Sequence, residues 1–270
     1  MIAVFRTAFL LATLASTSSA IAGDQRVWIF TGLPGDEEHH VDFEKTLGSL
    51  KSAFTTRLGV APDHLAIYYG PKSAGYTGEA TRENVLAAFK EIAAISHQSP
   101  QTEQWIIFIG HANAIRGGAQ LNLPGPDVNS MDLTTALADC DPAAPLTLFF
   151  THTASAPFLR PLAAPGRIIT TATAPGGIEN ETEFPSALAE TLNDPAADAN
   201  KDGKIDVTEI FLATKERVLK RYSSEKLIVR EAALLDGDGD GRGTQRPAEI
   251  DAKAAAERFF TLSTAGKGLE

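Results

Sequence analysis

The segment from residue 198 to residue 209 places an oxygen-bearing side chain at almost every second position. A hard cation such as Ca²⁺ takes roughly six to eight oxygen ligands at about 2.4 Å, and alternating carboxylates on a tight loop can surround it. Gly203 stands where such a loop turns most sharply, and Ile205 is the apolar residue that can tie the loop to the protein. The spacing therefore predicts a calcium site whose ligands are Asp198, Asn200, Asp202, the carbonyl of Lys204, Asp206 and Glu209.

These ligand positions are those of the twelve-residue EF-hand loop, and the alternative interpretation is a solvated turn rich in Asp and Gly. A second acidic run begins 38 residues later and repeats the alternation at Asp236, Asp238 and Asp240. Pro247 occupies the place of its bidentate glutamate, and Gly243 that of its apolar residue. The second run is therefore a half-loop that binds a cation weakly, donates a ligand to the first site or forms a turn.

Side chains that suit nucleophilic chemistry follow two apolar runs. His111 comes after the run 105–109, whereas His152, Thr153 and Ser155 come after the run 146–151. Ligand sites of open α/β sheets lie beyond the carboxyl ends of the strands, so both segments are candidates. A hydroxyl attacks only when a base accepts its proton and a third group orients that base, and no carboxylate is clearly placed for that role. Neither segment matches Gly-x-Ser-x-Gly, and the hydroxyls can equally cap backbone groups.

Cys140 is the only cysteine and a poor candidate for the nucleophile. It precedes the run 146–151, whereas His111 follows its own strand, so parallel strands would separate the two by about 20 Å. A thiol and its base must approach within about 3 Å. We therefore predict a partly buried structural thiol, and a chain with one thiol forms no intramolecular disulfide.

Apolar runs alternate with helical patterns along the first two thirds of the chain. The predicted strands are 26–31, 64–69, 105–109, 146–151 and 167–173, and the predicted helices are 43–58, 81–92 and 131–137. This alternation predicts an α/β fold with a mainly parallel sheet covered by helices on both faces. After about Phe184 the pattern becomes helical, with an exit helix at 209–222 and a closing helix at 248–262 anchored by Phe259 and Phe260.

The first 22 residues have the pattern of an export signal. A short basic start at Arg6, an apolar stretch from Ala8 to Ala15 and a cleavage-like sequence ending at Ala22 follow one another. The apolar stretch is shorter than the roughly 20 residues that cross a bilayer. We expect the mature chain to begin near Gly23 in the periplasm or outside the cell, and an uncleaved anchor is the alternative.

Composition limits the classes of partner. Of the 270 residues, 43% are hydrophobic, which is enough for a sizeable core, and the formal net charge is −10. This negative charge gives a nucleic-acid partner no electrostatic support.

The order of several motifs resembles the legumain and caspase superfamily of cysteine peptidases, especially its bacterial members. The segment 107–111, Ile-Phe-Ile-Gly-His, resembles the strand-then-Gly-His motif that carries the histidine of that family. Other similar segments are 32–36, 80–84, 121–127, 167–173, 198–209 and 234–241. The resemblance implies a caspase-like, mainly parallel sheet flanked by helices, with a C-terminal helical calcium-loop extension, in a family of peptide-bond hydrolases.

The sequence departs from that family at the nucleophile. Peptidases of the superfamily carry a cysteine after the fourth strand, where this chain has Thr153. His111 matches the family's histidine but is followed by Ala112 instead of the usual glycine. The resemblance therefore implies a degenerate site made of His111, Thr153 and Ser155.

Together these observations predict an exported, calcium-binding pseudopeptidase that binds a peptide or a protein partner. One alternative is an active hydrolase that uses Thr153 or Ser155 with His111, and another is a calcium-dependent adhesion or envelope component. The predicted organisation is a leader at 1–22, an α/β domain at 23–190, a calcium-binding extension at 191–250, and a C-terminal helix and tail at 251–270.

Overall fold

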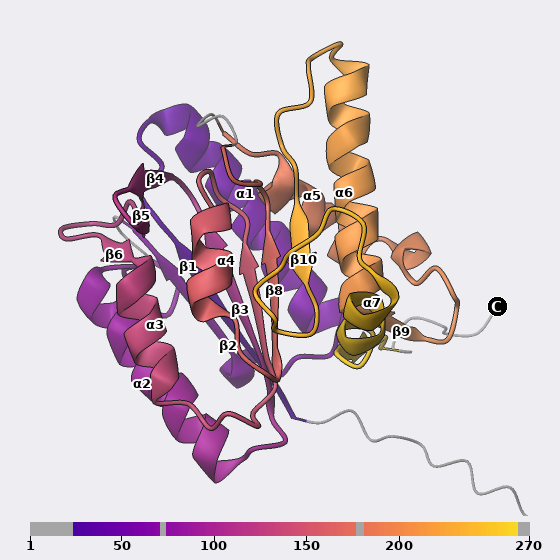
Figure 1. Ribbon diagram of the computed structural model, residues 1–270. Helices are drawn as coiled ribbons and strands as arrows, with labels where there is room; N and C mark the ends of the chain where they lie inside the picture. The colour runs from indigo at the N-terminus through magenta and orange to yellow at the C-terminus, as the bar shows by residue number, and fades with distance from the viewer. Residues whose placement is uncertain (1–23, 71–73, 177–180, 264–270) are drawn as a thin grey trace, which may run out of the picture.

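The computed structural model describes residues 24–70, 74–176 and 181–263 and has a six-stranded sheet at its centre (Figure 1). Five strands are parallel in the order β2-β1-β3-β7-β8, and β10 pairs antiparallel with β8. This sheet confirms the predicted mainly parallel α/β class, whereas the predicted leader at 1–22 lies outside the described residues. The strands are β1 (Gln25–Thr31), β2 (Leu65–Tyr69), β3 (Glu103–Ile109), β7 (Leu146–Phe150), β8 (Arg167–Thr171) and β10 (Leu234–Asp236).

Helices cover both faces of this sheet, as expected for right-handed crossovers between parallel strands. One face carries α1, the turn η1 that continues it, and α5, and α6 packs against α5. The other face carries α2, α3 and α4. Their bounds are α1 (Glu37–Ser52), η1 (Ala53–Arg57), α2 (Arg82–Gln98), α3 (Ser130–Ala138), α4 (Ala156–Leu162), α5 (Phe184–Asn193) and α6 (Val207–Ser224), with single turns η2 (Pro62–His64) and η3 (Pro195–Ala197).

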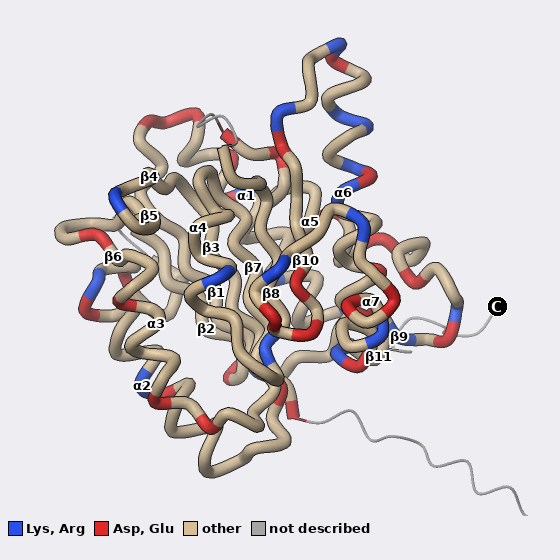
Figure 2. Tube along the Cα trace, in the orientation of Figure 1, with Lys and Arg blue, Asp and Glu red and all other residues tan. Residues whose placement is uncertain are grey.

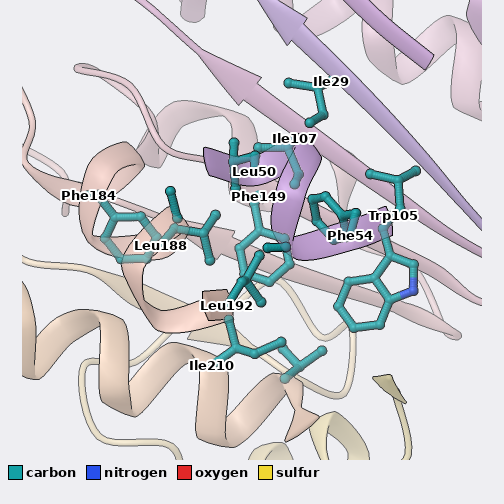
Figure 3. Close-up of a cluster of buried hydrophobic side chains, with 14 of the residues drawn as sticks. Ile29, Leu50, Phe54, Trp105, Ile107, Phe149, Phe184, Leu188, Leu192 and Ile210 are labelled. Atoms are coloured by element: carbon teal, nitrogen blue, oxygen red, sulfur yellow. The ribbon is translucent and has the colours of Figure 1, made fainter. Parts of the chain in front are cut away.

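The hydrophobic core consists of two layers, because successive strand residues point to opposite faces of the sheet. Figure 3 shows the layer on the α1 and α5 side, where Ile107 and Phe149 of the strands meet Leu188 of α5. On the other face, the rings of Phe30, Phe108 and Phe150 stack across neighbouring strands with centroids 5.2 and 5.0 Å apart. Continuous apolar runs such as 105–109 therefore form strands that are buried on both faces.

A small antiparallel sheet follows β3, in a region where no strand was predicted from the sequence. It consists of β4 (Ala112–Ile115), β5 (Gly118–Leu121) and β6 (Val128–Asn129). These strands have four residues or fewer, and most of β4 is exposed, so they lack the periodicity that identifies a strand. The small sheet leads the chain away from His111 and into α3.

The C-terminal part is integrated with the main sheet. The predicted boundary at residue 190 falls inside α5, and β10, from the predicted extension, is the sixth strand. The predicted closing helix is wrong beyond α7 (Glu249–Ala255), because β11 (Phe259–Thr261) pairs with β9 (Lys204–Asp206). The ring of Phe260 packs on Trp105 at a centroid distance of 4.2 Å, so this contact anchors β11 to the main sheet. Within the described residues, no helix is both long enough and apolar enough to cross a membrane.

Candidate functional site

The strand order defines one place where a ligand site is expected. The chain leaves β1 through α1 on one face of the sheet, whereas it leaves β3 and returns to β7 through α3 on the other face. In parallel sheets of order 2-1-3-4-5, this reversal opens a crevice at the carboxyl ends of the two strands, and ligands bind there. The candidate site is therefore expected beyond Thr31 and Ile109.

Two glycines allow the chain to leave these strands side by side. The N–H of Gly32 donates to the carbonyl of Ile109 at 3.0 Å, and a Cβ on Gly32 would lie 2.4 Å from the carbonyl oxygen of Asn122. Gly110 has φ +125°, a conformation that residues with a side chain rarely adopt. The close approach of these two backbones brings His111 next to the start of α1.

His111 contacts residues of α1 and of the loop before it. Its Nε2 lies 3.2 Å from the carbonyl oxygen of Pro34. Its ring lies 5.3 Å from the ring of His39 and 5.8 Å from that of Phe43, centroid to centroid. Among the hydrogen bonds of the described residues, none joins His111 to Thr153 or Ser155.

His39 is the centre of an ionisable cluster at the start of α1. Asp36 caps α1 by accepting from the backbone N–H of His39 at 3.0 Å, and it also lies 2.6 Å from Nδ1 of the same ring. The other ring nitrogen, Nε2, pairs with Glu181. The hydrogen bond to Asp36 raises the pKa of His39 above its ordinary value, and Glu181 acts in the same direction.

A pocket of about 430 Å³ lies against this cluster. Its walls come from α1, from Gly110 and His111, from α5 and the residues before it, and from α6. The cations Lys45 and Arg221 also face the pocket, but Arg221 pairs with both Glu183 and Glu190. The carboxylates that line it are Asp42, Glu181, Glu183, Glu190 and Glu225, so the pocket has an excess of negative charge.

The two candidate nucleophiles are buried and hydrogen-bonded to neighbouring segments. Oγ1 of Thr153 donates to the carbonyl of Ala112 at 3.1 Å and accepts from its N–H at 3.2 Å. The hydroxyls of Ser155 and Thr173 lie 2.9 Å apart, and each accepts from the other residue's N–H at 3.0 Å. Thr153 therefore joins the end of β7 to β4, and Ser155 joins it to the end of β8. Ala154 between them has φ 46°, so this turn is strained.

His152 is fully buried between aromatic rings rather than in the pocket. Its Nδ1 lies 2.6 Å from the carbonyl oxygen of Thr153, and its Nε2 has no partner among the described residues. The rings of Phe150 and Phe158 contact it edge-on, with centroids at 5.8 and 5.3 Å. Burial lowers the pKa of His152 to about 4, so the ring is neutral near pH 7.

Cys140 is buried and precedes β7, whereas His111 follows the parallel strand β3, so the two residues belong to opposite ends of the strands. Burial raises the pKa of its thiol, which disfavours the reactive thiolate.

The first acidic loop lies between η3 and α6. The ends of the loop meet, because Oε1 of Glu209 accepts from the N–H of Ala199 at 2.9 Å and from that of Asn200 at 3.2 Å. Asp198 is 9% exposed; its Oδ2 accepts from the N–H of Gly203 at 3.1 Å, whereas its Oδ1 is buried with no partner among the described residues. A buried carboxylate oxygen without a hydrogen-bond donor is unfavourable, so this atom is a candidate ligand for a cation.

The apolar residue of this loop anchors it as predicted for its eighth position. Ile205 is fully buried in β9, directly opposite Phe260 of β11. Thr208, at the start of α6, donates its hydroxyl to the carbonyl of Ala252 in α7 at 2.9 Å. The loop is therefore tied to the C-terminal segment and, through Phe260, to the core of the sheet.

The second acidic loop lies beside a ligand candidate on α7 that was not predicted from the sequence. Asp236 is buried at the end of β10, and its carboxylate comes within 4.8 Å of those of Asp238 and Asp251, measured between one oxygen of each. This is the one such group of three among the described residues, and it does not include Asp240. Asp251 lies on the first turn of α7, four residues beyond the position that Pro247 occupies. The sequence did contain a signal for Asp251, because this residue is acidic and lies near the start of the helix predicted at 248–262.

Comparisons with known proteins add a partial structural similarity. No protein-family model matches the chain, and no curated protein matches it either. A secreted C11 cysteine protease from Bacteroides thetaiotaomicron, solved with an irreversible peptide inhibitor, is similar in structure with a TM-score of 0.41 and 14% sequence identity. The similarity covers 75% of this chain and 60% of the protease.

Proposed function

We propose that this protein is an exported, calcium-binding pseudopeptidase that holds a peptide segment in the pocket beside His111 without cleaving it. The observation that supports this proposal is that both candidate nucleophiles already form hydrogen bonds with other residues. The hydroxyls of Thr153 and Ser155 are buried, and each bonds a neighbouring backbone and not His111. Attack by either hydroxyl would require breaking these bonds and finding a base, because an unactivated hydroxyl is a poor nucleophile near pH 7.

The charge of the pocket supports a ligand with a basic side chain. Glu183 and Glu190 are paired with Arg221, whereas Asp42 and Glu225 face the pocket without a salt bridge among the described residues. A volume of about 430 Å³ is sufficient for one or two side chains of a peptide. A lysine or arginine side chain would therefore meet acceptors for its N–H groups and gain electrostatic attraction.

The experiment measures binding and cleavage of a peptide library that contains basic and acidic members. We expect basic peptides to bind without giving cleavage products. The double variant Asp42→Asn with Glu225→Gln should weaken binding by roughly fivefold for each carboxylate removed, because a solvated pair of charges at 4 Å contributes about 1 kcal/mol. Glu216→Gln is the matched control, because Glu216 is exposed on α6 outside the pocket. Cleavage that disappears in Thr153→Ala or Ser155→Ala, and also in His111→Ala, would replace this proposal with the active-hydrolase alternative.

Calcium at the first acidic loop is the second part of the proposal, and the unpartnered Oδ1 of Asp198 supports it. The bound ion would neutralise a loop of several carboxylates and order its backbone, and β9, β11 and Phe260 would connect that order to the core. The residues that would hold it are Asp198, Asn200, Asp202, the carbonyl of Lys204, Asp206 and Glu209. Binding by Asp236, Asp238 and Asp240 stays a prediction.

Thermal unfolding with excess calcium and with chelator tests the role of the ion. At a free calcium concentration of about 100 times Kd, the folded state gains about 2.7 kcal/mol, which raises the Tm. Asp198→Asn should remove this gain, whereas Asp63→Asn, at an exposed site distant in sequence from both loops, should keep it. Identical unfolding curves of the wild-type protein in calcium and in chelator would refute bracing by the ion. The stoichiometry from a calorimetric titration separates one site from two.

A further inference from the structure

The end of α6 and the segment that follows it form a projecting arm, defined as residues 215–230. Figure 1 shows this arm rising beyond the sheet and its covering helices. The helix ends where Lys226 adopts φ 56° and the N–H of Leu227 donates to the carbonyl of Tyr222 at 2.8 Å, which reverses the chain. All residues from 223 to 230 are exposed. The arm therefore ends in a solvent-facing tip, residues 226–230.

Three consecutive large apolar side chains stand at this tip. Leu227 is 56% exposed, Ile228 79% and Val229 45%. Leu219 of α6 is also exposed and lines a small pocket together with Val229, so the apolar surface continues along the arm. Contiguous exposed apolar surface on a soluble protein marks an interaction site, because leaving it in water is unfavourable.

The charge of the arm is opposite to that of the whole protein. Residues 215–230 contain six Lys and Arg and two Glu, although the chain carries a net charge of −10 (Figure 2). Arg217 and Arg221 are paired with carboxylates of the body. Lys220, Lys226 and Arg230 are exposed and, among the described residues, form no ion pair. Unpaired cations therefore flank the apolar tip.

We infer that the arm docks on an anionic phospholipid surface, with its three apolar side chains entering the headgroup boundary. Lys220, Lys226 and Arg230 then face the lipid phosphates, which is the distribution of apolar and basic groups that interfacial segments use. A stable protein partner would need about 800 Å² on each side, and a tip of a few residues offers much less. The narrow shape and the free cations together favour lipid over an acidic protein.

The experiment is flotation of the protein with vesicles of phosphatidylcholine, with and without phosphatidylglycerol. Each flotation is run with calcium and again with chelator, because binding that persists in chelator excludes calcium bridges between the acidic loops and lipid. We expect binding to the anionic vesicles, with the partition coefficient falling roughly tenfold or more in Ile228→Ser. Lys226→Gln with Arg230→Gln should lower it roughly 30-fold, since each basic residue contributes about fivefold at an anionic surface. Met131→Ser, at an exposed apolar residue on α3, should bind as the wild-type protein does.

The single cysteine makes a second readout possible. In a Cys140→Ser background, an environment-sensitive dye on Ile228→Cys should shift its emission to the blue when anionic vesicles are added, whereas the same dye on Met131→Cys should not. Failure of the wild-type protein to float with anionic vesicles, or equal flotation of wild type and Ile228→Ser, would overturn the inference. Light scattering that reveals a dimer which Ile228→Ser abolishes, without lipid binding, would assign the arm to a second copy of the chain instead.

Discussion

His152 should make the stability of the protein fall as the solution becomes acidic. Its ring is fully buried and its pKa is lowered from the ordinary 6.5 to about 4. As the pH falls, the unfolded chain therefore binds a proton before the folded chain does, which favours unfolding. The loss begins below about pH 6.5 and levels off below about pH 4, where it totals roughly 3.4 kcal/mol. Between about pH 7 and pH 5 the same relation gives a loss of about 2 kcal/mol.

Urea unfolding at these two pH values, on wild type and His152→Gln, isolates this contribution. Other titrating groups are common to both proteins, so their contributions cancel when the two pH dependences are subtracted. The loss of unfolding free energy between about pH 7 and pH 5 should be about 2 kcal/mol smaller in the variant, whatever its stability at pH 7. Phe158→Leu is the control, because it weakens packing on the same ring and keeps the imidazole. Parallel pH profiles for wild type and His152→Gln would refute a buried, neutral His152.

Three further changes test the fold around the site. Gly32→Ala should lower the free energy of unfolding in urea by about 1–3 kcal/mol, because the new Cβ would lie 2.4 Å from the carbonyl oxygen of Asn122. Gly48→Ala is the control; it has open space around it in α1 and should be neutral or stabilising. Phe260→Ala should cost about 3–5 kcal/mol and weaken calcium binding, because β11 loses its anchor; unchanged calorimetric affinity would separate β11 from the loop. Glu231 is buried, and its carboxylate accepts from the N–H groups of Glu183 and Phe184 at the start of α5. Burial raises the pKa of Glu231 to about 7, so the wild type loses stability as the pH rises from about 4.5 to 7; Glu231→Gln should flatten this pH profile of the unfolding free energy, and a steeper profile would contradict the reasoning.

The central sheet was predictable because its signal is local in the sequence. Runs such as 105–109 are apolar at every residue, which is typical of strands covered on both faces, and the helical spacing between the runs indicates crossovers. The strands β4 to β6 and β11 were not predicted, since each is short and β4 to β6 pair only with one another. β11 pairs with β9, and its Phe260 packs on Trp105; both partners are far away in the sequence.

The candidate site was predictable in its location but not in its details. The Gly-His sequence after β3 identified one wall of the pocket, because the end of a parallel strand fixes where the next residue lies. Which way the hydroxyls of Thr153 and Ser155 point depends on Ala112 and Thr173, and no sequence spacing reports those partners. Asp251 was missed for a similar reason, since it approaches Asp236 from α7 instead of from the loop.

One helix links three parts of the molecule that were described separately. α6 begins at the first acidic loop, contributes Arg221 to the pocket, and ends at Ser224, next to the pocket residue Glu225 and just before the arm tip. Its 18 residues make a rod of about 27 Å, since each residue adds about 1.5 Å. If its first turn pivots by about ten degrees, its far end swings by about 5 Å, by the geometry of a rod of that length. Through this mechanical leverage, a change at the first acidic loop would alter both the shape of the pocket and the angle at which the arm meets another surface.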